Sequence, residues 1–454
     1  MTILLALILA VQQPAQVALD NVTVIDIATG IRASGSTVLI TGNRITAVGP
    51  SAGVTIPPGA RRVDGRGGFV IPGLWDMHVH LSMTGRSALA LFLASGVTGV
   101  RDMGGDFSRV GPWRDSVARG LVTGPRILTA GPIVERGNWL RAVKDISRRL
   151  NQPNLIAEVD RRLGLDSVSD GQRVVDSLAK LGVDFIKIRN FPPAPVYFAF
   201  ARAARSRGLR ISGHSPFMSM VGPASDSGFA TFEHSFLDVQ NEALVGGFDA
   251  LSPADRAALF GRLARNGSSF DPTLVATRSR FVPDSTITQM IADTGGTIHR
   301  GLRYASPAVR EDWREQLALR EADTPADWNP IYQSTLRDVK EMAAAGGLIL
   351  SGTDVPVVTL IPGYSLLDEL ELLVKDGGLT PLAALVSSTI NPAKVLGLAD
   401  SLGLVKPGYV ADLIVLDRDP TLDISAVRAL SVVIRNGRLL NRNELDRLRE
   451  EGRK

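Results

Sequence analysis

IPGLWDMHVHL, residues 71–81, is the stretch of sequence that decides the fold. It is an apolar, strand-like run that ends in two histidines, His78 and His80. Side chains two residues apart on a strand point to the same face, so both imidazoles enter one site. Imidazole ligands suit zinc and related divalent ions. The stretch therefore predicts half of a metal site at the end of a β-strand.

Four more polar residues close short apolar runs elsewhere in the chain. They are Lys187 in DFIKI, His214 in RISGH, His234 in TFEH and Asp354 in LILSGTD. The chain has only five histidines, so chance does not account for four of them at such positions. In a (β/α)8 barrel the carboxyl ends of the strands all face one pocket, so residues far apart in sequence converge there.

The middle of the chain, residues 69–399, alternates strand-like and helix-like segments. Eight strands that alternate with helices favour an α/β fold of the (β/α)8 TIM-barrel type over an open sheet. The sequence contains no glycine-rich nucleotide-binding motif that would favour a doubly wound fold. The strand candidates are residues 74–81, 97–104, 126–134, 184–190, 210–216, 231–236, 268–276 and 348–356.

Both ends of the chain are rich in short β-like runs with turn residues between them. We expect residues 17–68 and 400–441 to form one small β-sandwich, with the barrel inserted between its two parts. Residues 442–454 are expected to be a charged tail. The long polar segments 136–170 and 278–330 are interpreted as loops or helical insertions near the mouth of the barrel.

The first residues carry a weak export signal. ILLALILAV, residues 3–11, has the length of a signal-peptide core but lacks a preceding basic residue, and it is too short to span a membrane. We interpret residues 1–16 as a signal peptide of a periplasmic or extracellular protein, with a buried first strand in a cytoplasmic protein as the alternative. No other stretch is long and apolar enough for an integral membrane span in the mature chain.

Composition describes a large enzyme-like chain without a nucleic-acid surface. Its 454 residues carry 50 basic and 46 acidic side chains, a net charge of +4, with no long basic run. There is no cysteine, which excludes disulfides, thiolate metal ligands and a cysteine nucleophile. We expect a small-molecule substrate and no nucleic-acid partner. The sequence leaves open whether the chain forms a homo-oligomer.

Lys187 is the sharpest of the single-residue inferences. A lysine inside an apolar strand is buried, which lowers its pKa, and a neutral amine can add CO2 to give a carbamate. That carbamate resembles a carboxylate and can bridge two cations. The alternative is a lysine ion-paired with Asp354 or another barrel acid. His214 and His234 could likewise be ordinary core histidines, and we interpret His299 as solvated or structural, with substrate contact as the alternative.

At these motifs the chain resembles the amidohydrolase superfamily. PGLWDMHVHL, GVTGVRDMG, DFIKI, FEH, SGTDVP, TINPAKVLGL and LGLVKPGYVADLIVLD stand where that superfamily carries its hallmarks. The likeness is greatest to its imidazolonepropionase-like and Xaa-Pro dipeptidase (prolidase-type) branch, which carries a carboxylated lysine. The resemblance implies two divalent ions, with zinc favoured. By the same resemblance the buried ion would be held by His78, His80, Lys187 and Asp354, and the more exposed ion by Lys187, His214 and His234.

Two loops depart from that branch. After the third strand the chain reads ERGNWL, with Asn138 and Trp139, where relatives often carry Gly-Gly-His. After the lysine strand it reads RNFPPAP instead of a glycine-rich loop. We interpret Arg189 and Asn190 as candidates for binding a substrate carboxylate or oxyanion, because a guanidinium makes two parallel bonds to a carboxylate. Asn138, Trp139 and Tyr197 are further pocket candidates.

The chemistry expected of this set is metal-assisted hydrolysis of an amide-like C–N bond in a dipeptide, an N-acyl amino acid or a cyclic amide. Asp354 would take a proton from the attacking water and deliver it to the leaving nitrogen. A lactonase or esterase on the same site is the first alternative, and a mononuclear deaminase fits less well because such enzymes usually lack the bridging lysine. A non-catalytic secreted binding protein should have lost a ligand, and none is missing.

Overall fold

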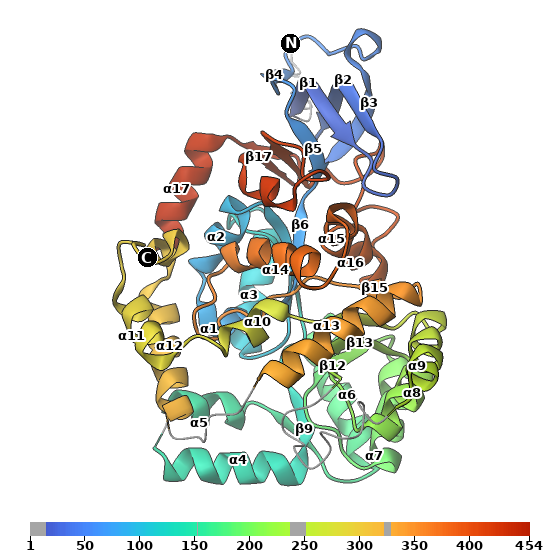
Figure 1. Cartoon of the computed structure of the whole chain (residues 1–454), viewed down its shortest axis with the longest axis vertical. Coiled ribbons are helices and arrows are strands. Elements are labelled where there is room, and N and C mark those ends of the chain that lie inside the picture. Colours follow the sequence, from blue (N-terminus) through green and yellow to red (C-terminus); the bar gives the residue numbers. More distant parts are fainter. Residues whose placement is uncertain (1–14, 152, 237–250, 322–327) are drawn as a thin grey trace, which may run out of the picture.

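The computed structural model describes residues 15–151, 153–236, 251–321 and 328–454. The signal-peptide prediction falls almost entirely on residues 1–14, outside this part of the chain. The described residues form a mixed α/β fold. A small β-sheet lies at one end of the molecule, and a larger body of parallel strands and helices lies below it (Figure 1).

The small sheet is assembled from both ends of the chain. Its central contact is the antiparallel pairing of β5 with β16, in which Pro72 lies opposite Leu413. Hydrogen bonds join all of its strands into a single sheet of eight, in the order β18-β17-β16-β5-β1-β2-β3 with β4 paired to β1. The strands are β1 (Gln16–Ile25), β2 (Arg32–Thr41), β3 (Arg44–Pro50), β4 (Arg61–Asp64), β5 (Phe69–Pro72), β16 (Leu413–Leu416), β17 (Leu430–Arg435) and β18 (Arg438–Leu440).

The remaining strands pair only in parallel, in two sheets. The first has the order β6-β7-β8, and the second has the order β10-β9-β11-β12-β13-β14-β15. Each of the eight strand candidates overlaps one of these strands, β10 is additional, and β9 shares only Val134 with a candidate. The strands are β6 (Leu74–Val79), β7 (Val97–Asp102), β8 (Arg126–Thr129), β9 (Val134–Arg136), β10 (Leu163–Leu165), β11 (Ile186–Ile188), β12 (Ile211–His214), β13 (Phe229–Glu233), β14 (Ser269–Asp271) and β15 (Leu348–Ile349).

Hydrogen bonds connect the two parallel sheets on both sides. Asp184 N, just before β11, donates to Thr129 O at the end of β8 over 2.9 Å. On the other side, Met77 N of β6 donates to Ser351 O beyond β15 over 2.9 Å, and Val79 forms a parallel bridge with Val355. The strands from β6 to β15 are therefore linked in a continuous series.

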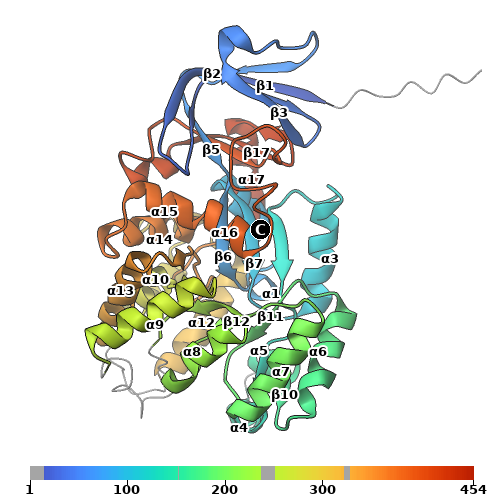
Figure 2. The same ribbon diagram turned by 90° about the vertical axis from the view of Figure 1, so that its right-hand side faces the viewer.

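Helices surround these strands, as Figure 2 shows for α6, α7, α8 and α9. Helix α6 illustrates the local rules: it ends at Gly182, which takes a left-handed φ of 75° and donates to Ala179 O. The helices are α1 (Leu81–Thr84), α2 (Ala88–Ala94), α3 (Phe107–Ala118), α4 (Gly137–Arg149), α5 (Pro153–Asp160), α6 (Asp170–Leu181), α7 (Ala194–Ser206), α8 (Met218–Asp226), α9 (Pro253–Arg265), α10 (Leu274–Ser279), α11 (Asp284–Ala292), α12 (Pro307–Glu321), α13 (Asn329–Ala344), α14 (Tyr364–Lys375), α15 (Pro381–Ser387), α16 (Ile390–Val395) and α17 (Arg442–Gly452), with short 3-10 turns η1 (Ser51–Gly53), η3 (Arg300–Tyr304) and η4 (Ile424–Arg428).

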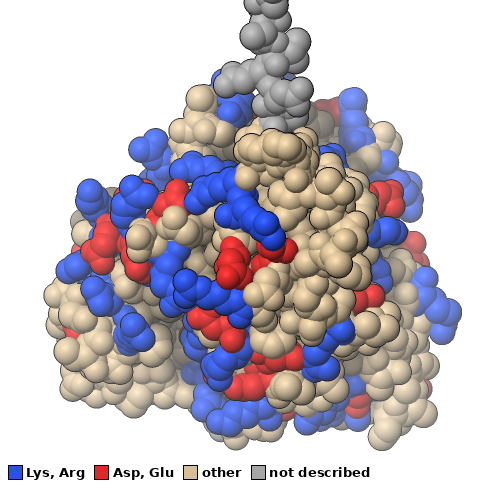
Figure 3. Space-filling view, turned by 90° about the horizontal axis from the view of Figure 1, so that it is seen from above, with Lys and Arg blue, Asp and Glu red and all other residues tan. Residues whose placement is uncertain are grey.

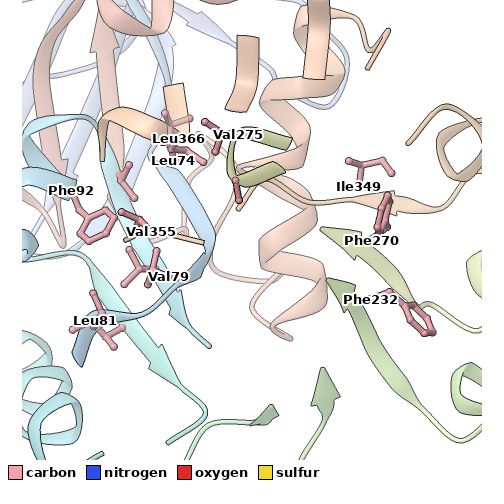
Figure 4. Close-up of a cluster of buried hydrophobic side chains, with 14 of the residues drawn as sticks. Leu74, Val79, Leu81, Phe92, Phe232, Phe270, Val275, Ile349, Val355 and Leu366 are labelled. Carbon is pink, nitrogen blue, oxygen red and sulfur yellow. The ribbon is translucent and has the colours of Figure 1, made fainter. Parts of the chain in front are cut away.

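The main core lies where strands and helices meet. Val79 of β6 and Phe92 of α2 are buried on one side of it, and Phe232, Phe270 and Ile349 extend from β13, β14 and β15 (Figure 4). On β13 the flanking residues Thr231 and Glu233 alternate with Phe232, so polar side chains point away from the apolar layer. This alternation places the charged side chain of Glu233 on the face of the strand opposite to Phe232.

The two long polar insertions are helical. The first contains α4, α5 and the short strand β10, and the second contains α11, η3 and α12. The second insertion forms a separate core cluster together with Val358 and Ile361, and its Trp313 is fully buried there.

Residues 442–454 are not the charged tail that we expected. Most of them form α17, which begins with a capping box between Asn441 and Glu444. Its Leu445 and Leu448 are buried, and the helix packs against α2 (Figure 1). Two leucines three residues apart are enough to give this very polar segment a buried face.

The surface agrees with the absence of a basic run in the sequence. On the face shown in Figure 3, Lys and Arg side chains alternate with Asp and Glu and do not form one continuous basic patch. In the part of the chain that the structure describes, no helix combines the length and apolar character that crossing a bilayer requires.

Candidate metal centre

The strand that carries HVH meets the loop after β15 at one point. His78 lies in β6, His80 follows its end, and Asp354 follows β15. The Nε2 atoms of both histidines lie 3.3 Å from Asp354 Oδ1. Two imidazole nitrogens and one carboxylate oxygen therefore share one small volume, as the sequence predicted. This is a donor set that divalent metal ions accept.

The glycine of SGTD permits this approach. A Cβ at Gly352 would lie 2.5 Å from Asp271 Oδ2 and 2.6 Å from the Cβ of His78. Any larger residue there would push the β15 loop away from β6. The motif thus needs glycine for close packing, and the position of Asp354 depends on it.

The ring nitrogens that face away from this point are hydrogen bonded. The Nδ1–H of His78 donates to Glu233 Oε2 over 2.9 Å, and that of His80 donates to Gly104 O over 2.8 Å. With the proton on Nδ1, each ring presents the lone pair of Nε2 toward Asp354. His78 Nε2 is buried and has no hydrogen-bond partner among the described residues.

Lys187 lies on β11 and is 1% exposed. Its Nζ has no hydrogen-bond partner in the part of the chain that the structure describes. Burial lowers the pKa of Lys187 to about 8, while Glu233 and Asp354 act in the opposite direction. A substantial fraction of the amine is therefore neutral near pH 8. The direct ion pair with Asp354, the alternative from the sequence, is not formed.

His214 and His234 complete the cluster. Their ring centroids lie 4.8 Å apart, and the His234 ring lies 4.5 Å from that of His78. Burial holds the pKa of both well below the usual histidine value, so both rings are neutral and able to bind a metal. The ligand atoms of His78, His234 and Asp354 all lie within 4.8 Å of one another. Five of the six sequence-predicted ligands thus lie together, and Lys187 is within electrostatic range of them.

The backbone is strained at three of the strand ends that meet here. His234, Thr273 and Asp354 have φ angles of 67°, 43° and 59°, in the left-handed region that residues other than glycine seldom adopt. The Thr273 hydroxyl and His234 Nδ1 lie 2.7 Å apart. Strain of this kind persists only where the surrounding structure enforces it, and it gathers at functional sites.

A charged network under the histidines was missed by the sequence analysis. Arg101 of β7 donates to Glu233 Oε1 over 2.8 Å and lies 3.6 Å from Asp271 Oδ2. Burial raises the pKa of Glu233 to about 7 against the opposing effect of Arg101, and burial also raises that of Asp271. The signal that could have found these residues is a charge inside each of three apolar strand runs, VTGVRD, TFEH and SFD.

The candidate substrate contacts divide into those near the site and those away from it. Arg189 lies 5.6 Å from the centroid of the Trp139 ring, a cation–π distance. The Asn190 amide donates to Glu135 Oε2 over 2.8 Å, so Glu135 holds its nitrogen. Asn138 is exposed, and its side chain accepts from Trp139 N. Among these candidates, Arg189, which lies beside Trp139, is therefore a cation without an ion-pair partner among the described residues.

Tyr197 does not reach the site, contrary to our prediction. Its side chain is fully buried on α7, with its ring 4.9 Å from that of Phe191, and its hydroxyl lies 3.2 Å from Ser227 Oγ. The aromatic ring fills the core between strands and helices. The prediction relied on the short separation in sequence between Tyr197 and Lys187. In the structure the first turn of α7 directs the Tyr197 ring into the core instead.

A second arginine–indole pair was missed. Arg280 follows α10 and lies 5.1 Å from the centroid of the Trp328 ring. Neither Arg280 nor Arg189 has an ion-pair partner among the described residues. Burial lowers the pKa of both, and Asp354 is among the charges that act on each. Two unpaired guanidiniums thus lie within electrostatic range of Asp354.

His299 lies elsewhere. It is exposed, and its Nδ1 accepts from Gly301 N at the start of η3. With Tyr304 and Tyr364 it lines a cavity of about 620 Å3 between η3, α14 and α17, and none of the six predicted ligands lines that cavity. The structural reading of His299 therefore agrees with its position.

Comparisons with known proteins agree with this arrangement. Residues 288–440 match the model of the Amidohydrolase family. The ochratoxinase of Aspergillus niger is 24% identical over 420 residues, which is 82% of this chain and 75% of that protein. The imidazolonepropionase of Rubrobacter xylanophilus is 26% identical over 408 residues, 85% of either chain. A solved Xaa-Pro dipeptidase with bound methionine has a TM-score of 0.66 at 21% identity, covering 94% of this chain and all of that one.

Proposed function

We propose that the chain is a member of the amidohydrolase family and a metal-dependent hydrolase of carbon–nitrogen bonds, which uses two divalent ions to cleave amide substrates that carry a carboxylate. The observation that supports this most directly is the meeting of His78, His80 and Asp354 beside Lys187. The names of the similar proteins point the same way: an imidazolonepropionase and a Xaa-Pro dipeptidase.

The residues present fit two metal ions. His78 Nε2 and Lys187 Nζ are buried polar atoms without hydrogen-bond partners among the described residues, a costly state unless a ligand completes them. His78, His80 and Asp354 would hold one ion, and His214 and His234 would hold the other. Zinc is the favoured ion, because neutral imidazole and carboxylate are its common ligands. When bound, such ions polarise a carbonyl and lower the pKa of an attacking water.

We propose that Lys187 is carboxylated and bridges the two positions. Its neutral amine would form a bond from Nζ to the carbon of CO2 and release one proton, which leaves an anionic carbamate with two oxygens. Burial favours the neutral amine that this reaction needs, and Glu233 and Asp354 are the acids close enough to oppose it.

Asp354 is the proposed proton carrier. Burial alone would raise its pKa, but the neighbouring histidines hold the pKa of that carboxyl well below its usual range, so it is ionised and can accept a proton. It would take the proton of the attacking water and deliver it to the nitrogen that leaves. Its left-handed backbone fixes where the carboxylate points, which removes the entropy cost of finding that position during turnover.

The two arginine–indole pairs favour an anionic substrate. Arg189 and Arg280 are cationic, unpaired among the described residues and near Asp354. A substrate carboxylate between them would gain charge-assisted hydrogen bonds, and the indoles of Trp139 and Trp328 would hold the guanidinium planes. Dipeptides and N-acyl amino acids carry such a carboxylate next to the scissile amide.

The test is a substrate panel run together with metal analysis. N-acyl amino acids, Xaa-Pro dipeptides and lactones are compared, each acid paired with its carboxamide as a neutral control. We expect the free acids to be hydrolysed fastest, a chelator to abolish turnover, and added zinc to restore it. Hydrolysis that survives complete metal removal would exclude this function, and a preference for lactones would favour the alternative lactonase.

We further propose that the parallel strands close into a (β/α)8 barrel. β8 and β9 would be one strand interrupted at Gly131 and Pro132, since β8 pairs with β7 and β9 pairs with β11. The bridge from Val79 to Val355 would close the ring. The sheet from both termini would fold on itself as the small β-sandwich, around apolar residues contributed by β1, β2 and β16. An experimental structure would test both, as N-terminal sequencing of the mature protein would test export.

A further inference from the structure

We propose that Glu233, held in place by Arg101, is the positioning residue for the metal ligand His78, and that the strand β13 thereby supports both metal positions. This inference rests on the proposed metal site. It assigns a role to two charged residues that the hydrolytic mechanism does not use.

Arg101 is a fixed anchor under the site. It is 1% exposed, and each of its nitrogens is engaged: Nε donates to Met77 O over 2.6 Å, Nη1 to Thr231 Oγ1 over 3.0 Å and Nη2 to Glu233 Oε1 over 2.8 Å. These contacts tie β7 to β6 and β13. A guanidinium held at three nitrogens has no freedom to move, so the carboxylate that it grips is equally fixed.

Glu233 passes this fixed geometry to His78. Its Oε1 accepts from Arg101, and its Oε2 accepts from His78 Nδ1–H over 2.9 Å. Both oxygens are therefore used, and neither is free to bind an ion itself. The His78 ring is turned so that Nε2 faces Asp354, and the negative charge behind it makes that nitrogen a stronger electron donor.

The three hydrogen-bonded histidines are not equivalent. His78 is backed by a carboxylate, His80 by the carbonyl of Gly104 and His234 by the hydroxyl of Thr273. Only the carboxylate carries a charge, so His78 gains the most from its partner. Removal of that partner should weaken the ion at His78 and Asp354 more than the ion at His214 and His234.

The adjacent residues Glu233 and His234, at the end of β13, would contribute to the sites of both ions. Glu233 and His234 are adjacent, and in a regular strand their side chains would point to opposite faces. His234 instead has a φ of 67°, which turns its ring back toward His78, with the two ring centroids 4.5 Å apart. Glu233 thus supports a ligand of one ion, while the next residue is itself a ligand of the other.

The position of Asp271 suggests an alternative, a third metal ion, which the experiment must distinguish from positioning by Arg101. Ligand atoms of His78, Glu233 and Asp271 lie within 4.8 Å of one another, and a cation among them would be a third metal. Arg101 already brings its positive charge to this position, with Nη2 3.6 Å from Asp271 Oδ2. Positioning by Arg101 is therefore favoured over a third ion.

The experiment measures metal affinity in the full-length protein, with Co2+ as the probe. Glu233→Gln and Glu233→Ala are titrated with a chromophoric chelator, and the d–d absorption bands of the Co2+ forms are recorded. We expect one of two Co2+ ions to bind about 10–100-fold more weakly, with altered bands, while the other keeps its affinity. Glu233→Asp, which keeps the charge, should recover part of the loss. Thr273→Val should weaken the opposite ion.

The controls separate positioning from a general loss of stability. Asp412→Asn changes a buried aspartate that pairs with Arg435 of the small sheet and contacts none of the six candidate ligands, and it should leave Co2+ affinity unchanged. If Glu233→Ala does not fold, Glu233→Gln and Arg101→Lys decide the question.

If folded Glu233 variants bind both Co2+ ions with the parent's affinities and show unchanged d–d bands, the inference is wrong but the proposed metal site stands. Loss of a third Co2+ would instead identify a third ion. A parent protein that binds no Co2+ at all would overturn the proposed function itself, so the two failures are distinguishable.

Discussion

Replacing Asp354 by asparagine tests the proposed proton transfer directly. The change keeps the size of the side chain and one oxygen, which can stay near the Nε2 atoms of His78 and His80, now 3.3 Å from Oδ1. It removes the ability to accept a proton. We expect substrate binding to survive and turnover to fall.

The size of the fall follows from the role. A positioned general acid–base group contributes about 10²–10⁴-fold, so kcat should drop by at least ~10²-fold, or about 2.7 kcal/mol. KM should stay near the parent value, because Arg189 and Arg280 are unchanged. The pKa of Asp354 is held well below its usual range, so the carboxylate stays ionised throughout that range, and loss of parent activity through its protonation should begin only at lower pH.

The assay is steady-state kinetics on samples whose metal content is measured in parallel. Asp417→Asn is the matched control, since it changes an exposed aspartate paired with Arg442 and should leave kcat unaltered. If Asp354→Asn turns over at close to the parent rate with full metal occupancy, another residue moves the proton and our assignment is wrong.

Four other outcomes follow from the structure. Lys187→Ala should lose one of two ions and most activity, and short carboxylic acids should restore part of both; elemental analysis and rescue assays measure this, and a plain lysine in a metal-loaded crystal structure would contradict the carbamate. Metal-free protein given zinc and bicarbonate should regain activity faster as the pH rises through about 8, because more of the Lys187 amine is then neutral; a rate that is flat with pH would argue against it. Arg280→Met and Arg189→Met should each raise KM for acids and leave it unchanged for the matching carboxamides, and equal effects on both would show that neither binds the carboxylate. Leu445→Ala, at a fully buried position of α17, should lower the free energy of unfolding by about 2–5 kcal/mol, and a melting temperature equal to the parent's would contradict the packing of this helix.

The positions of the candidate ligands could be predicted from the sequence because each lies in or shortly after a strand. A histidine at the end of RISGH or TFEH has its place set by the strand before it, and parallel strands bring their ends together. Nothing beyond local pattern is needed for that inference. The same reasoning identified Lys187, since an apolar run on both sides implies burial.

The supporting charges could not be predicted because they depend on pairs of strands distant in sequence. Arg101 and Glu233 lie on β7 and β13, far apart in sequence, and only the tertiary structure brings their side chains to 2.8 Å. The prediction for Tyr197 was wrong for the opposite reason. Tyr197 is close to Lys187 in sequence, but the geometry of its helix turns the ring into the core. The helix α17 was missed because its two buried leucines are outnumbered by charges.

The pairing of Pro72 with Leu413 has a consequence for synthesis of the chain. The strand β5 emerges from the ribosome early, but β16 is made only after nearly all of the large body. At about 5–20 residues per second, β5 waits on the order of tens of seconds for its neighbour. During that time its hydrogen-bonding edge is exposed to other nascent chains, and exposed edges invite aggregation. A ribosome that stalls before residue 413 would therefore release a chain whose first sheet cannot be completed.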